Sequence, residues 1–207
     1  MDTLLALTDG APGAALLLAA MLLFSLYTLK LRPDLLDRCL FRPYWLLPRR
    51  EYPTLITSAF AHADLAHLGF NAFTFWAFGF QLERQMGTGT FLALYAFGLL
   101  VSDAGTWFKH RSEPEYRCLG ASGAITAVLF ASIVYFPHAA IYMMPIPAPI
   151  PAPLFAVAYL AYTYYASRQQ GGRINHDAHL AGALAGLVFV AMVDPAVLAR
   201  AWQGLWA

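Results

Sequence analysis

A serine flanked by glycines is the first candidate for chemistry in this sequence. In the stretch GASGAITAVLFA, Ser122 stands between Gly120 and Gly123 at the start of an apolar run. Small residues at such positions let membrane helices pack closely, and for this stretch alone packing is the simpler interpretation. The GxSxG elbow of soluble hydrolases follows a β-strand, and that pattern fits poorly here. Ser122 becomes a candidate nucleophile only when a base and oxyanion donors accompany it.

Two further stretches carry polar side chains at helical spacing. His67 and Asn71 are four residues apart, so a helix presents them on one face. His179, Gly182 and Gly186 share one helical stripe, where the glycines would let another helix approach the face that carries the imidazole. A structural hydrogen bond explains each group equally well when it is taken alone. Together with a serine, they supply a general base and polar donors for an oxyanion.

The composition predicts that membrane-spanning helices position these residues. Hydrophobic residues make up 59% of the 207-residue chain and charged residues only 12%, against about 25% charged in soluble domains. The formal net charge of +1 predicts no nucleic-acid partner, and the bilayer is the expected environment. The two cysteines, Cys39 and Cys118, form no metal-binding pattern, so we expect neither a metal nor a cofactor. Because Asp2 and Asp9 replace a basic start, the first apolar run is expected to remain as a span.

Uncharged windows close to the roughly 20 residues of a membrane span define the expected helices. We expect six helices, at residues 12–30, 64–83, 89–108, 119–136, 153–167 and 178–198. They would form a single membrane domain over residues 1–207. The large loop at about 31–63 mixes arginines with aromatic and aliphatic residues, as suits the membrane interface. The PIPAPIPAP segment at 145–153 predicts a stiff, polyproline-like connection.

The order and spacing of these motifs, from about Leu55 to Asp194, resemble the rhomboid intramembrane serine proteases. That family carries a histidine and an asparagine four residues apart on its second helix, followed by an acidic residue and a glycine. A GxSG motif opens its fourth helix, and its sixth helix carries AHxxGxxxG. The matching residues are His67, Asn71, Glu83, Gly87, Gly120, Ala121, Ser122, Gly123, Ala178, His179, Gly182 and Gly186.

The resemblance implies an all-α membrane protein, a six-transmembrane-helix rhomboid bundle with a large interfacial loop between helices 1 and 2. It implies a catalytic dyad in which Ser122 is the nucleophile and His179 the base. Asn71 and His67, with the backbone amide of Ser122, would face the oxyanion. The supporting glycines would be Gly120, Gly123, Gly182 and Gly186. The implied substrates are transmembrane proteins, and the implied location is a bacterial inner membrane, in which the chain passes several times.

Some positions depart from the family pattern or take other roles. Many rhomboids carry an aromatic residue one helical turn after the serine, where this chain has Thr126, so an aromatic of the second or fifth helix is expected to hold the histidine instead. Asp177 is two positions from His179 and points elsewhere on a helix, as a loop or cap residue would. Structural or interface roles are expected for Glu83, Arg84 and Asp194.

The charges of the loops conflict with the topology that the resemblance implies. Of the 13 Lys and Arg residues, 11 fall in the segments 30–63, 109–117 and 168–177. The positive-inside rule places these segments in the cytoplasm, whereas bacterial relatives imply that they face outward.

Two alternative functions stay open on the sequence. A non-catalytic rhomboid-like protein would bind membrane helices without cleaving them, although such a protein would lose the serine or the histidine, and this chain has both. A metal-dependent membrane protein would use histidines, but their spacing is a weak zinc signal. Its candidate ligands are His62, His67, His176 and His179.

Overall fold

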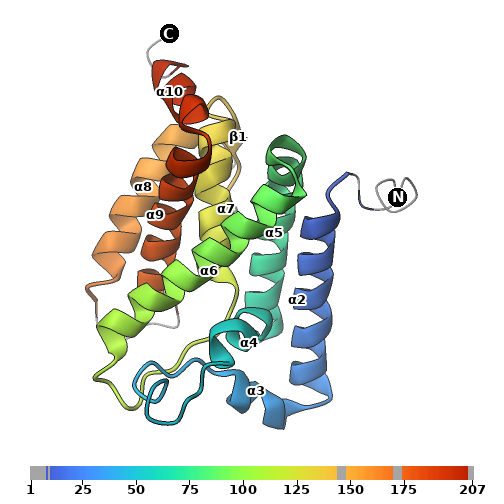
Figure 1. Ribbon diagram of the computed structural model, residues 1–207, viewed down its shortest axis with the longest axis vertical. Helices are drawn as coiled ribbons and strands as arrows, with labels where there is room; N and C mark the ends of the chain where they lie inside the picture. The colour runs from blue at the N-terminus through green and yellow to red at the C-terminus, as the bar shows by residue number, and fades with distance from the viewer. Residues whose placement is uncertain (1–7, 9, 144–147, 170–173, 205–207) are drawn as a thin grey trace.

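The computed structural model describes residues 8, 10–143, 148–169 and 174–204. Its helices are α2 (Pro12–Lys30), α3 (Pro33–Cys39), α4 (Thr54–Phe60), α5 (Leu65–Met86), α6 (Thr88–His110), α7 (Ser122–Tyr135), α8 (Ala152–Ala166), α9 (His176–Val193) and α10 (Pro195–Gly204). Two short strands, β1 (Ala140–Ile141) and β2 (Ile150–Pro151), pair antiparallel between α7 and α8. The fold is therefore mostly helical, and in Figure 1 α2, α7, α8 and α9 run roughly vertically while α6 crosses the view diagonally.

Helix α7 is the central element of the bundle. Its residues from Gly123 to Val134 are all buried, because the helix is apolar on every side and packs against α5, α6 and α9. Helices α2 and α8 lie at opposite edges of the bundle in Figure 1. Within α8 only Ala152 and Thr163 are buried, and about half of the helix is exposed.

The segments predicted to be helical are helical in the structure, with shifted ends. Helix α2 matches its predicted bounds, whereas α5 and α6 extend about one turn or less beyond theirs. Among the described residues, three helices are long and apolar enough to cross a membrane, namely α2, α6 and α9. Helix α7 is apolar but has only 14 residues.

The bounds of two predicted helices need correction, and the large loop has structure of its own. The predicted last helix at 178–198 ends at Val193, because Pro195 starts a separate helix, α10, after the break at Asp194. The predicted fourth helix begins at Ser122 instead of residue 119, because the preceding backbone is fixed by other contacts. The large loop at 31–63 contains the short helices α3 and α4.

The proline-rich connection differs in part from the expectation. Residues 144–147 lie outside the described part of the chain. Ile150 and Pro151 form β2, which pairs with β1, and Ala152 already belongs to α8. A short strand pair therefore replaces part of the expected polyproline-like segment.

The ends of the elements matter for the site. Helix α7 begins at the end of the bundle where α3 and α4 lie, and α6 ends there (Figure 1). The basic segments 30–63 and 109–117 thus lie at the same end of the bundle as Ser122.

Candidate active site

The backbone before α7 fixes where Ser122 stands. Phe41 and Cys118 exchange two backbone hydrogen bonds, of 2.9 and 3.0 Å, and Gly120 N–H donates to the Ser58 carbonyl at 2.8 Å. Gly120 has φ +115°, a conformation that side chains other than glycine rarely adopt. This turn ends the extended segment, so Ser122 becomes the first residue of α7. Its backbone N–H therefore belongs to the helix start, where amides have no partner within the helix.

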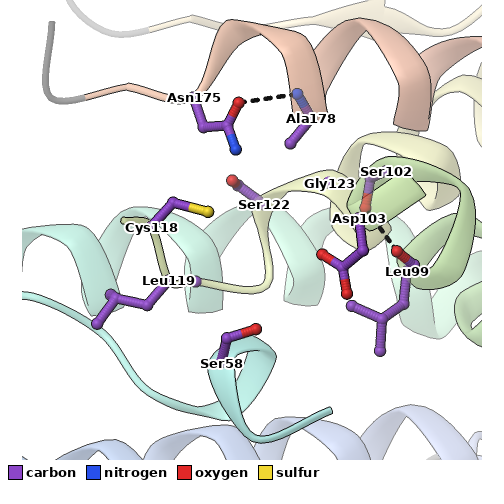
Figure 2. A pocket seen from close by; sticks show the side chains of 11 residues that line it. Ser58, Leu99, Ser102, Asp103, Cys118, Leu119, Ser122, Gly123, Asn175 and Ala178 are labelled. Atoms are coloured by element: carbon purple, nitrogen blue, oxygen red, sulfur yellow. Dashed lines mark hydrogen bonds between the residues drawn. The ribbon is translucent and has the colours of Figure 1, made fainter. Parts of the chain in front are cut away.

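Ser122 opens onto a small polar cavity of about 20 Å³, which is room for about one water molecule. Figure 2 shows Ser122 between Cys118 and Asn175. The lining residues are Ser58, Leu99, Ser102, Asp103, Cys118, Leu119, Gly120, Ser122, Gly123, Asn175 and Ala178. Burial raises the pKa of the Cys118 thiol to about 12, so the thiol is protonated at neutral pH and does not compete with Ser122 as a nucleophile.

Helix α9 is held against α6 just before His179. Asn175 caps the helix by accepting a hydrogen bond from Ala178 N–H at 3.0 Å, and its amide donates to Thr106 Oγ1 at 3.0 Å. Asp177 accepts one hydrogen bond from Lys109 Nζ at 2.8 Å, and its second oxygen is hydrogen-bonded to His110 Nε2 at 3.1 Å. Asp177 therefore points toward α6, which agrees with the expectation that it does not face His179. It is not the expected loop or cap residue, since it lies in the first turn of α9 and Asn175 is the N-cap.

Glycines bring α7 and α9 into backbone contact. A Cβ added to Gly182 would lie 2.9 Å from the carbonyl carbon of Gly123, and still closer to its oxygen. One turn further along, Gly186 meets the backbone of Ala127 in the same way. A Cβ on Gly123 would lie 3.4 Å from the carbonyl oxygen of Ala178. The residue that follows Ser122 therefore touches the residue that precedes His179.

This close approach predicts the cost of a larger side chain. Replacing Gly182 with alanine is expected to destabilise the fold by about 1–3 kcal/mol, because the methyl group would overlap backbone atoms that cannot rotate away. Thermal unfolding in detergent micelles measures the effect. Gly89→Ala on α6 is the matched control, since an added methyl group meets nothing within 4 Å there. Equal melting temperatures for the two variants would contradict the packing described here.

The imidazole of His179 is contacted by Tyr159 of α8. The Tyr159 hydroxyl lies 3.1 Å from His179 Nδ1, and the two ring planes are inclined by 22° with their centroids 6.4 Å apart. Thr126, at the position where many rhomboids carry an aromatic residue, donates instead to the Ser122 carbonyl at 2.7 Å. In the described part of the chain no hydrogen bond joins Ser122 Oγ to His179.

His67 and Asn71 lie on α5, next to the turn that precedes Ser122. The His67 ring packs against Gly120, where an added Cβ would come within 2.7 Å of the ring. Asp64 caps α5 by accepting from His67 N–H at 2.8 Å. Asn71 is buried, and its amide donates to the His67 carbonyl at 2.9 Å. An amide nitrogen has two hydrogens, so one donor of Asn71 is left for another acceptor.

The remaining histidines have separate surroundings. His62 is fully buried, and burial lowers its pKa to about 3, so it is neutral. Ser25 donates its only hydroxyl hydrogen to the Phe60 carbonyl. The hydroxyl oxygen must therefore accept the hydrogen bond from His62 Nδ1–H, at 2.8 Å. The His62 and His67 ring centroids are 4.9 Å apart, and those of His176 and His179 are 6.0 Å apart. The described residues contain no group of three or more His, Cys, Asp or Glu side chains suited to a metal ion.

The acids predicted to be structural make helix caps. Glu83 is buried and accepts hydrogen bonds from the first backbone amides of α2, at Gly13 and Ala14, and from Thr88. Asp194 ends α9, accepts from the Tyr135 hydroxyl at 3.2 Å and caps α10 through Val197 N–H. Both side chains therefore join neighbouring helices.

The sequence predicted that an aromatic residue of the second or fifth helix contacts His179, and Tyr159 of the fifth predicted helix does so, although it was not named. Asn175 and Asp103 were not singled out. Asn175 had a visible signal, since asparagine before a helix is a common N-cap. Asp103 was a carboxyl group inside an apolar window, which is expensive in a membrane and therefore informative. It lines the cavity, and its Oδ2 is buried without a hydrogen-bond partner among the described residues.

Comparison with known proteins identifies the family of this chain. Residues 49–195 match the Rhomboid domain family, and the chain belongs to the rhomboid family. It is 29% identical over 164 residues to Rhomboid protein 1, mitochondrial, of Saccharomyces cerevisiae, an alignment that covers 76% of this chain and 47% of that protein. It is 30% identical over 145 residues to RHOMBOID-like protein 12, mitochondrial, of Arabidopsis thaliana, covering 63% of this chain and 43% of that protein.

A bacterial relative is similar over a shorter stretch. Rhomboid protease GluP of Bacillus subtilis is 38% identical over 87 residues, which is 42% of this chain and 16% of that protein. The alignments to all three relatives cover less than half of each relative's length. The family includes serine proteases, and its members are helical membrane proteins.

Proposed function

We propose that this protein is an intramembrane serine endopeptidase that cleaves peptide bonds in or near transmembrane segments of other membrane proteins. The observation that carries the proposal is the backbone contact of α7 with α9 through Gly123 and Gly182, which brings Ser122 and His179 to one end of the bundle. His67 packs against the turn that leads to Ser122, so α5 contributes its polar residues to the same place. Membership of the rhomboid family supports the same reaction.

The proposed reaction follows the roles of a serine and histidine dyad. Ser122 Oγ attacks the carbonyl carbon of the substrate, and His179 Nε2 accepts the hydroxyl proton. His179 then gives the same proton to the amine of the broken peptide bond. The amine departs, and the acyl group stays bound to Ser122 as an ester. A water molecule, deprotonated by His179, hydrolyses that ester and restores the serine. The cavity beside Ser122 is large enough for one such water molecule.

The negative oxygen of each tetrahedral intermediate needs donors. We assign this role to the backbone N–H of Ser122, at the N-terminus of α7, and to the side chains of Asn71 and His67. A helix N-terminus carries partial positive charge and unpaired amides, which favour an anion. Because Gly120 has no side chain, the His67 ring can pack against the turn before Ser122, close to these donors.

We further propose that residues 1–207 form one membrane domain with six spans, namely α2, α5, α6, α7, α8 and α9. Helix α7 is short, but its complete burial in protein reduces its contact with lipid. The segment between α2 and α5 would lie in the membrane interface, where exposed Leu47, Tyr52 and Ile56 meet lipid and the arginines meet headgroups.

The location is that of an integral membrane protein. The relatives include mitochondrial proteins of yeast and Arabidopsis as well as a bacterial one, so the comparisons do not support the narrower prediction of a bacterial inner membrane.

The test uses purified protein in detergent and a generic single-span substrate in two forms. One form carries Gly and Pro residues after the cleavage region, and the other carries Leu at those positions. We expect cleavage after a small residue near the substrate helix end on the Ser122 side. The Leu form should be cleaved more slowly, because helix unwinding then costs about 1 kcal/mol more for each Gly and about 3 for each Pro, on the scale of soluble helices.

Each alternative function gives its own outcome in this assay. No cleavage of either form, with retained substrate binding, would indicate a non-catalytic rhomboid-like protein. Strong inhibition by EDTA would favour the metal-dependent reading. Equal rates for the two substrate forms would show that the sequence at the cleavage site, and not helix instability, selects the substrate.

A further inference from the structure

Helix α8 provides a contact with His179 that the proposed reaction does not yet use. The Tyr159 hydroxyl lies 3.1 Å from His179 Nδ1. This contact joins α8 to α9 through two side chains. Helix α8 also makes apolar contacts with the bundle, and seven of its fifteen residues are exposed. Because it is made to the imidazole of the proposed base, the hydrogen bond from Tyr159 bears directly on the reaction.

The chemistry of the imidazole decides which partner donates. To accept the Ser122 proton, His179 Nε2 must be unprotonated, so its single hydrogen must be on Nδ1. The Tyr159 oxygen then accepts a hydrogen bond from Nδ1–H. With the opposite arrangement, the hydroxyl would donate to Nδ1, and Nε2–H could not accept a proton. The group bonded to Nδ1 thus determines whether His179 is a base toward Ser122.

We propose that Tyr159 is a positioning residue that holds His179 in the Nδ1–H tautomer and fixes the direction of its ring. This inference rests on the proposed function. In a serine triad the third group is a carboxylate on Nδ1–H. Here the nearest acidic residue in sequence, Asp177, is bound to Lys109 and His110 on α6, so it does not reach that position.

The surroundings of Tyr159 fix its own position. Its ring packs against Phe130 of α7 and Phe155 of α8, with centroids 5.6 Å away in each case. Thr126 of α7 has no aromatic ring, and its hydroxyl donates within α7 to the Ser122 carbonyl. Tyr159 therefore supplies from α8 the aromatic face that α7 lacks, and adds a hydrogen bond to it.

The test compares Tyr159→Phe with Tyr162→Phe. Tyr162 is on the same helix and largely exposed, and its ring contacts His176 and not His179, so Tyr162→Phe removes a hydroxyl of α8 without removing the bond to His179. The reaction with a serine-directed fluorophosphonate needs Ser122 and His179 but no entry of a substrate helix. We expect Tyr159→Phe to lower the labelling rate and kcat about 5- to 10-fold, with KM and melting temperature unchanged, because one neutral hydrogen bond is lost. Tyr162→Phe should match the wild type.

A second measurement does not depend on a variant of Tyr159. In protein labelled with ¹⁵N-histidine, the His179 signals, assigned by their loss in His179→Ala, should report a protonated Nδ1 and an unprotonated Nε2. An Nε2–H tautomer would overturn the proposal. So would wild-type labelling by Tyr159→Phe, or a raised KM with normal labelling, which would make Tyr159 a substrate contact. If Ser122→Ala still cleaves substrate, the proposed function itself fails, whatever Tyr159→Phe does.

Discussion

Ser122→Ala and His179→Ala are each expected to lower kcat for a transmembrane substrate by about a thousandfold or more, while the protein stays folded. The serine supplies the attacking oxygen and the histidine its base, so each removal disables the whole unit. The double variant should be no slower than either single one, since residues that act as a unit are not additive. Rates of cleavage in detergent, with thermal unfolding measured alongside, provide the check.

Ser132→Ala is the matched control for the serine. Ser132 lies on α7 as Ser122 does, but it is buried and is not part of the lining of the cavity beside Ser122. The control should keep wild-type activity, and a serine-directed phosphonate should label the wild type at Ser122 alone. Normal turnover by Ser122→Ala or by His179→Ala would reject the dyad.

The helices could be predicted well where apolar windows have clear ends. Pro12 starts α2 and Lys30 ends it, at the two positions predicted. The predicted end of the last helix was wrong, because the apolar pattern continues past Asp194. The helix ends there since Pro195 has no backbone N–H to donate the hydrogen bond that a continuous helix needs. The short helices α3 and α4 depend on contacts of the 31–63 segment with the bundle, which apolar windows do not report.

Prediction of the site succeeded to the extent that local spacing carries the information. The glycine stripe on α9 predicted a close approach by another helix, and Gly182 indeed meets Gly123. The contact of Tyr159 with His179 joins two helices through the direction of two side chains, and no periodic pattern specifies that direction. The catalytic roles of Ser122, His179, Asn71 and His67 stay predictions, which the variants decide.

Asn71→Ala is expected to lower kcat by about 100- to 1000-fold with little change in KM. In the proposed reaction the amide of Asn71 donates to the oxyanion, and one oxyanion donor is worth about 2.7–4 kcal/mol in the transition state. The structure leaves one amide hydrogen free for this task, because the Asn71 bond to the His67 carbonyl uses only one of the two. A bond made mainly in the transition state changes kcat and not substrate binding.

Burial of Asn71 makes a packing role the competing explanation, so activity and stability must be measured on the same samples. The bond to the His67 carbonyl lies within α5 and joins no second helix, so its loss should reduce the melting temperature only slightly. His67→Ala should also lower kcat, but by a smaller factor than Asn71→Ala. The His67 ring packs against Gly120, so part of its contribution is packing. If the free energy of unfolding falls in proportion to activity in both variants, the two side chains are packing groups, and the oxyanion must be held by backbone amides at the start of α7.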